Sequence, residues 1–161
     1  MTVTIWDGVL PNPDDYVKEI LKGEFIDIDD GPYVFKGIQP RESDIFSYIV
    51  KSMFKGYSVA WNFVRQSPVG QQEPNFIHTD EMMGDKTVLL YLNKTYPQGA
   101  GTTLYDENDP MCVIKYKYNR MCVFDSKQRH SRNLEENFGE GTNARLVQVI
   151  FLKHDSKTSN L

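Results

Sequence analysis

From residue 57 onward the sequence is a succession of short strand-like runs with no helical pattern between them. β-Branched and aromatic residues concentrate in seven runs, which Gly, Pro, Asn and Asp residues separate. The runs are residues 57–65, 73–77, 86–93, 102–105, 111–116, 120–124 and 144–153. Parallel strands need a crossover of a dozen or more residues, usually a helix, so this spacing favours antiparallel pairing. We therefore predict a mainly β fold, either an antiparallel sandwich or a jelly roll.

Two amphipathic helices are predicted before these strands. The first covers residues 12–22, with Pro13 at its first helical position and Gly23 just past its end. The second covers about residues 42–55, where apolar pairs recur every four residues and Gly56 follows. Each helix has one apolar face, so we expect both to pack on the sheet and to take no part in chemistry.

Strand periodicity assigns faces to two of the runs. In the run 86–93, the face that we expect to pack against the helices carries Val88, Leu90 and Leu92, and the opposite face carries Thr87, Leu89 and Tyr91. In the run 144–153, one face carries Arg145, Val147, Val149 and Phe151. An arginine in line with large apolar side chains is expected to point inward, where its charge needs an anion.

The composition is that of one globular domain. The chain has 161 residues, of which 40% are hydrophobic, enough for a substantial core. No apolar run approaches the ~18 residues of a membrane span, and residues 1–6 lack the features of a signal peptide. We expect a soluble, cytoplasmic protein with no membrane partner. The formal net charge is −4 and no basic run occurs, which argues against nucleic acid as a partner.

Two histidines and an aspartate form a candidate metal site. His78 and Asp80 stand at a predicted strand end, where residues two apart point to the same side. His130 follows 52 residues after His78 and would reach the same ion from a distant strand. Two histidines and one carboxylate are the facial triad that holds non-heme Fe(II) and leaves coordination positions open. The alternative is a surface histidine beside a surface aspartate, because His-x-Asp alone is a weak motif. His154, beyond the last predicted strand, is not expected to bind the metal.

Residues 57–153 resemble the Fe(II)- and 2-oxoglutarate-dependent dioxygenases, in particular their prolyl 4-hydroxylase-like branch. The matching pieces are 78–80, 87–93, 99–105, 119–124, the segment around His130 and the strand that begins near Arg145. The resemblance implies a double-stranded β-helix (jelly roll) with two N-terminal supporting helices. It implies a single domain over 1–161, with a leading strand and packing helices in 1–56, the jelly-roll core in 57–153 and a polar tail in 154–161.

The resemblance also implies roles for individual residues. His78, Asp80 and His130 would be the iron ligands and the catalytic centre. Arg145 would pair with the distal carboxylate of 2-oxoglutarate, and the Tyr91 hydroxyl would help to bind the same carboxylate.

The chain departs from the family at one point. The basic residue that binds the cosubstrate usually follows the second histidine by roughly ten positions, whereas Arg145 follows His130 by fifteen. A longer loop between the same two strands absorbs this difference. Arg132 is the competing anion clamp. Asn62 and Arg65, on the strand that leads toward the metal site, are further candidates, and either could contact cosubstrate or substrate.

By this resemblance the protein hydroxylates an organic substrate and releases succinate and CO2. Its cofactors would be Fe(II), 2-oxoglutarate as cosubstrate, O2 and ascorbate. The substrate would be a small molecule or a peptide, with peptidyl or free amino acids favoured by the prolyl hydroxylase resemblance. We expect the loops 29–41, 66–75 and 94–101 to line the mouth of the barrel, with a mixture of aromatic and amide side chains.

Two other classes of protein remain open from the sequence. One is a cupin-like metal enzyme of redox-neutral chemistry, which a fourth ligand such as Glu81 would favour. The other is a catalytically inactive jelly-roll module that serves only in binding. Neither alternative requires Tyr91 and Arg145 on converging strands.

Overall fold

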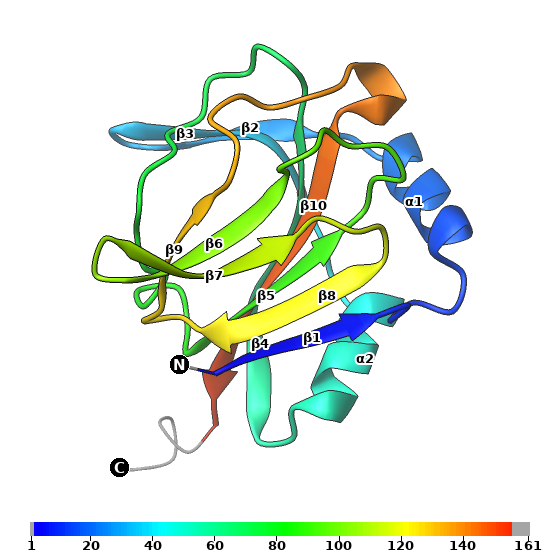
Figure 1. Ribbon diagram of the computed structural model, residues 1–161. Coiled ribbons are helices and arrows are strands. Elements are labelled where there is room, and N and C mark those ends of the chain that lie inside the picture. The colour runs from blue at the N-terminus through cyan, green and yellow to red at the C-terminus, as the bar shows by residue number, and fades with distance from the viewer. Residues whose placement is uncertain (1, 156–161) are drawn as a thin grey trace.

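A computed structural model describes residues 2–155 and consists mainly of two antiparallel sheets (Figure 1). The major sheet has the order β1 (Val3–Asp7), β8 (Arg120–Asp125), β5 (Lys86–Tyr91), β10 (Arg145–His154), β4 (Tyr57–Ser67), β3 (Tyr33–Pro40) and β2 (Ile26–Asp30). The minor sheet has the order β7 (Asp109–Lys115), β6 (Gly101–Asp106) and β9 (Arg129–Arg132). The predicted jelly roll is therefore confirmed.

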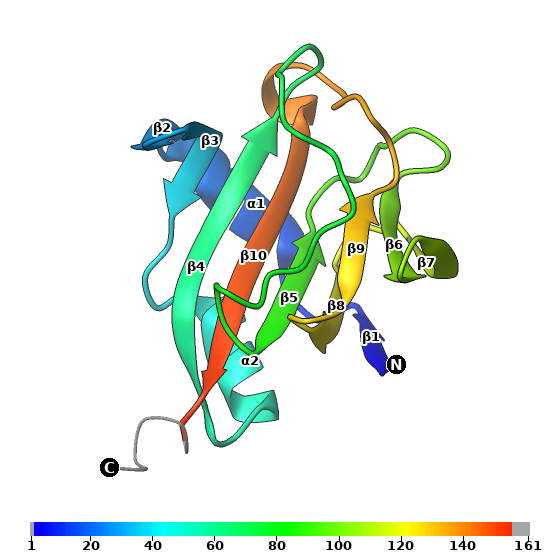
Figure 2. The ribbon, with the colours of Figure 1, turned by 90° about the vertical axis from the view of Figure 1, so that its left-hand side faces the viewer.

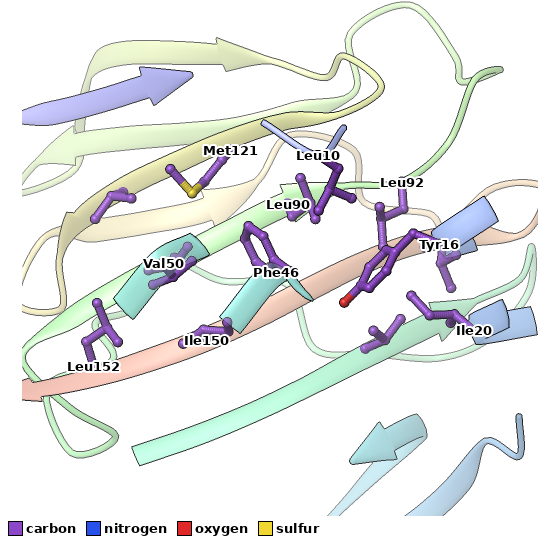
Figure 3. Packing of buried hydrophobic residues seen from close by; sticks show 14 residues of the cluster. Leu10, Tyr16, Ile20, Phe46, Val50, Leu90, Leu92, Met121, Ile150 and Leu152 are labelled. Carbon is purple, nitrogen blue, oxygen red and sulfur yellow. The ribbon is translucent and has the colours of Figure 1, made fainter. Parts of the chain in front are cut away.

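The helices α1 (Pro13–Lys22) and α2 (Ile45–Met53) lie against the outer face of the major sheet. Figure 3 shows Tyr16 and Ile20 of α1 and Phe46 and Val50 of α2 packing over side chains of the central strands. The strand residues in this layer include Val88, Leu90, Leu92, Met121, Ile150 and Leu152. The predicted aliphatic face of residues 86–93 is thus the face that the helices cover.

A second apolar layer fills the space between the two sheets. It combines Tyr91, Leu104, Ile114, Cys122, Phe124 and Val147. The inward face of the major sheet therefore carries the odd-numbered residues of β5 and β10, as strand alternation predicts. This inner face is the one that the candidate site uses. Neither helix in residues 2–155 has the length and apolarity that a membrane crossing requires.

The helix boundaries differ slightly from the predicted ones. The second helix begins at Ile45 rather than near residue 42, because Asp44 and Ser47 form a capping box: each side chain bonds the other's backbone N–H. The first helix begins at Pro13 as expected, but the Asn12 side chain makes no capping hydrogen bond.

Two predictions for the strands and loops were wrong. Residues 73–77 form no strand; Pro74 has no N–H for a ladder, and regular pairing reduces to one bridge at His78. Residues 29–41, predicted as a mouth loop, belong largely to the β2–β3 hairpin, which extends the major sheet. The polar tail begins one residue later than predicted, since His154 ends β10, and residues 156–161 of that tail lie outside the described residues.

Candidate functional site

The backbone brings the two histidines together. His78 lies in the long connection between β4 and β5, which Figure 2 shows passing between β10 and β9. Its N–H donates to the His130 carbonyl over 3.0 Å, and the His130 N–H donates to the His78 carbonyl over 2.9 Å. The Asp80 N–H donates to the Ser126 carbonyl over 2.8 Å, so the aspartate is held beside the turn that leads into β9.

The three side chains converge on one point. The Asp80 carboxylate has one oxygen 3.5 Å from His78 Nε2 and the other 3.0 Å from His130 Nε2. One ligand atom from each residue lies within 4.8 Å of the other two. Metal–ligand bonds of ~2.1 Å at right angles separate neighbouring ligand atoms by roughly 3 Å. These donor atoms therefore fit a single divalent ion with little movement.

Each histidine ring is oriented by its own main chain. His78 Nδ1 lies 2.9 Å from the Phe76 carbonyl, and His130 Nδ1 lies 2.8 Å from the Gln128 carbonyl. A carbonyl only accepts, so both Nδ1 atoms carry the hydrogen, and in the neutral rings both Nε2 atoms keep the lone pair that a metal needs. The carboxylate is also fixed from behind, because the Thr87 hydroxyl donates to Asp80 Oδ2 over 3.1 Å.

The electrostatics of the cluster keep the carboxylate ionised. Burial opposes its charge, but the hydrogen bonds that the protonated His130 and His78 rings donate through Nε2 outweigh burial and hold the pKa of Asp80 well below its usual range. The hydrogen bond to Asp80 raises the pKa of His78 above its ordinary 6.5. Glu81 is exposed and is not part of the metal-binding group in the described residues, so the geometry offers no glutamate as a fourth ligand.

Arg145 and Tyr91 lie on the inner face at the far end of the barrel from the triad. Val147 pairs with Tyr91 in the register of β10 and β5, while Phe151 pairs with Thr87 beside Asp80. Within residues 2–155 no carboxylate lies within 4.0 Å of the Arg145 guanidinium. An inward guanidinium without a carboxylate partner has the charge that an anionic ligand requires.

Tyr91 is fully buried and remains a neutral donor. Its hydroxyl lies 2.8 Å from Thr102 Oγ1, and its ring stacks on that of Tyr116 with centroids 4.3 Å apart. Burial raises the pKa of Tyr91 well above its ordinary value. Arg132, the competing clamp, lines the same small cavity as Arg145. It is already engaged, since its Nε and Nη2 donate to the Leu134 and Glu135 carbonyls over 2.8 and 2.6 Å.

The structure does not bring Asn62 to the triad. Its side chain donates to the Glu42 carbonyl over 3.1 Å and accepts from Gln148 Nε2 over 2.8 Å. Both partners belong to the helix-covered side, and Val64, two residues along the same strand face, is part of the outer core. Strand alternation therefore turns Asn62 away from the barrel interior.

Glu73 of the inner face was not recognised in the sequence as part of a site, whereas its partner Arg65 was a candidate beside Asn62. Arg65 and Glu73 form a part-buried ion pair, with Nε and Oε1 3.1 Å apart. Glu73 lies in the segment that was wrongly predicted as a strand, so sequence periodicity carried no signal for its position. Arg65 shares a strand face with Phe63 of the inner core, so of the two candidates on this strand it is Arg65 that points inward.

Solved structures with the same fold cover almost the whole chain. A prolyl hydroxylase from Trichoplax adhaerens, in complex with a hypoxia inducible factor oxygen degradation domain peptide fragment, has a TM-score of 0.70 and 16% identity over 98% of this chain and 86% of its own. A 2OG-Fe(II) oxygenase family oxidoreductase from Burkholderia pseudomallei has a TM-score of 0.65 and 10% identity, over 94% and 85%. The viral collagen prolyl hydroxylase of Paramecium Bursaria Chlorella virus-1 has a TM-score of 0.63 and 14% identity, over 94% and 89%.

These likenesses confirm the predicted fold: the chain has the double-stranded β-helix of 2-oxoglutarate- and Fe(II)-dependent oxygenases, including prolyl hydroxylases. No protein-family model matches the sequence, and no curated protein matches it either. A fold can host many reactions, so the activity has to be argued from the site.

Proposed function

We propose that the protein is a non-heme Fe(II)- and 2-oxoglutarate-dependent dioxygenase that hydroxylates an organic substrate. The observation that carries the proposal is the convergence of His78, Asp80 and His130 at the inner face of this fold. Bound Fe(II) would supply the activation of O2 that couples decarboxylation of 2-oxoglutarate, to succinate and CO2, to hydroxylation of a C–H bond. Ascorbate would serve as the reductant that maintains the ferrous state.

The groups around the triad hold its side chains in a geometry that suits a metal ion. The Phe76 and Gln128 carbonyls hold the two rings by Nδ1, so both Nε2 atoms face the metal position before binding. Asp80 stays ionised and supplies one negative charge against the two positive charges of the ion. The Phe124 ring, 4.8 Å from the His130 ring between centroids, shields one side of the site from water.

In this proposal Arg145 receives the distal carboxylate of 2-oxoglutarate and Tyr91 assists. The inward direction of Arg145 and its lack of a carboxylate partner in residues 2–155 support this role over an ordinary structural ion pair. Tyr91 lies on the neighbouring strand, and its raised pKa keeps the hydroxyl protonated. Arg132 is the weaker candidate because main-chain carbonyls already occupy much of its guanidinium.

For the substrate we propose a peptidyl or free amino acid. The fold likeness to prolyl hydroxylases, one of them solved with a peptide, supports this class. The exposed ring of Phe76, which lies 5.4 Å from the His78 ring between centroids, would give the substrate an apolar contact beside the metal.

The proposal is tested by turnover in the absence of a known substrate. Purified protein supplied with Fe(II), ascorbate and 2-oxoglutarate should form succinate slowly, and His78→Ala should abolish this activity. A control with Glu81→Gln, which changes an exposed carboxylate next to the triad, should retain it. If no succinate forms and calorimetry detects no binding of 2-oxoglutarate, the dioxygenase proposal is wrong.

A further inference from the structure

A buried carboxylate of the chain itself lies among the arginines of the barrel interior. Glu73 belongs to residues 68–77, here called the strap, which has no helix or strand. Its side chain is only 3% exposed. The carboxylate lies 3.1 Å from Arg65 Nε and 3.8 Å from Arg132 Nη1, and it accepts hydrogen bonds from Gln71 and Asn137 over 2.9 and 2.7 Å.

The two arginines do not depend on Glu73 for their positions. Arg65 Nε also donates to the Lys36 carbonyl over 3.0 Å. Arg132 is held by the two main-chain carbonyls that follow it in sequence. Main-chain carbonyls therefore position both guanidinium groups, and Glu73 occupies a site that would attract a carboxylate in any case.

Arg145 belongs to the same electrostatic cluster. The pKa of Arg65 is lowered first by burial and further by the positive charge of Arg145, and the same two causes lower the pKa of Arg132. Arg65 also pairs in register with Val147, two residues from Arg145. Any anion that binds Arg145 is thus close enough to compete with Glu73 for the attraction of these charges.

We propose that Glu73 is an internal anion that fastens the strap over the barrel interior, and that binding of 2-oxoglutarate at Arg145 loosens it. This inference rests on the proposed function, because it names 2-oxoglutarate as the competing anion. The coupling is reciprocal. If bound 2-oxoglutarate weakens the interaction of Glu73 with the arginines, then the interaction of Glu73 with the arginines lowers the affinity for 2-oxoglutarate by the same factor. The strap also carries Asn75, whose amide bonds the Arg132 carbonyl, and it leads directly to His78, so its release would change access to the metal site.

Affinity for the cosubstrate gives the first test. Wild type, Glu73→Gln and the control Glu24→Gln are loaded with Mn(II) and titrated with 2-oxoglutarate in a calorimeter. Glu24 is exposed, so its substitution removes the same charge from the surface of the protein. We expect Glu73→Gln to bind 2-oxoglutarate about fivefold more tightly, as removal of one nearby like charge predicts, and Glu24→Gln to match wild type.

Hydrogen exchange of the strap amides gives the second test. In the Mn(II) form of wild type, 2-oxoglutarate should speed exchange at residues 69–77. In Glu73→Gln exchange should be fast from the start and should not respond to 2-oxoglutarate. Glu73→Asp keeps the charge and should retain the response, which a merely structural role for the longer side chain does not predict.

The failures can be told apart. If neither wild type nor Glu73→Gln binds 2-oxoglutarate, the proposed function fails and the inference fails with it. If both bind it with equal affinity and strap exchange in wild type ignores 2-oxoglutarate, the inference alone is overturned. Should Glu73→Gln not fold, the exchange of wild type with and without 2-oxoglutarate decides the question.

Discussion

The pKa of His78 is raised and that of Asp80 is lowered, so metal binding at the proposed site should depend on pH. The metal needs the unprotonated imidazole, and the hydrogen bond to Asp80 raises the pKa of His78 above 6.5. We therefore expect the affinity for Mn(II) to fall as pH drops below that raised pKa, by about tenfold per unit for one competing proton. Asp80 remains ionised throughout, because its pKa is lowered. Calorimetry between pH 8 and 6 would measure the effect, and a constant affinity would contradict it.

The raised pKa of His78 has the opposite effect on the stability of the metal-free protein: acidic pH favours its folded state. A raised folded-state pKa contributes stability that is fully present below the unfolded pKa and is lost as pH rises through the folded value. His78 therefore favours the folded metal-free protein at mildly acidic pH. The metal would reverse this preference, since it binds only the neutral ring.

Arg145 is the residue with which the cosubstrate assignment can be tested most directly. Replacement by Met keeps much of the apolar stem and removes the guanidinium, so the dissociation constant for 2-oxoglutarate should rise at least about thirtyfold. Mn(II) binding should hardly change, because Arg145 lies at the other end of the inner face from Thr87 and Asp80. Arg132→Met is the matched comparison, and a larger loss there would move the clamp to Arg132.

At the scale of elements, Asp44 joins α2 to the major sheet. It caps the helix through Ser47 and accepts hydrogen bonds from the Tyr16 hydroxyl over 2.9 Å and from Gln148 Nε2 over 3.1 Å. Gln148 belongs to β10, the strand that also carries Arg145. The polar network therefore fixes a helix, through a buried contact, to the strand that forms part of the site.

Loss of this network should destabilise the whole domain. Asp44→Ala removes a helix cap and leaves buried donors unpaired, so we expect unfolding by urea to show a loss of about 2–4 kcal/mol. Asp15→Ala, at an exposed position in α1, should change the stability by less than about 0.5 kcal/mol. The pKa of Asp44 is lowered despite burial, mainly by the backbone hydrogen bond from Ser47, so its contribution is present above 3.8 and disappears as pH falls through the folded value.

At the scale of the whole molecule, the triad ties together parts of the chain that the unfolded state separates. His130 belongs to the minor sheet, and Asp80 is hydrogen-bonded to Thr87 of the major sheet. A metal that binds all three ligands binds the folded protein in preference to the unfolded chain. Mn(II) at a hundred times its dissociation constant should therefore add about 2.7 kcal/mol to the free energy of unfolding.

Thermal unfolding with and without Mn(II) measures this gain. The melting temperature should rise with Mn(II) concentration in wild type and should stay constant in Asp80→Asn, which removes the charged ligand. A stabilisation of equal size in the variant would mean that Mn(II) binds elsewhere.

Local pattern was enough to predict several features from the sequence. Alternation and helical periodicity identified α1, α2 and most core strands, because burying one face imposes a period that short segments carry by themselves. The inward face of β10 with Arg145 followed from the same rule. Spacing and family resemblance together singled out the triad residues, which the structure brings within reach of one ion.

Tertiary structure alone decided the rest. The β2 strand is an exposed edge rich in aspartate, so it lacks an apolar signal, and only pairing with β3 makes it a strand. Residues 73–77 were predicted as a strand, yet the Asn75 side chain donates to the Arg132 and Leu134 carbonyls and the Glu73 carboxylate pairs with Arg65. Asn62 and Glu73 show the physical reason: a sequence states which residues alternate, but packing between distant elements selects which face is buried and which charges meet.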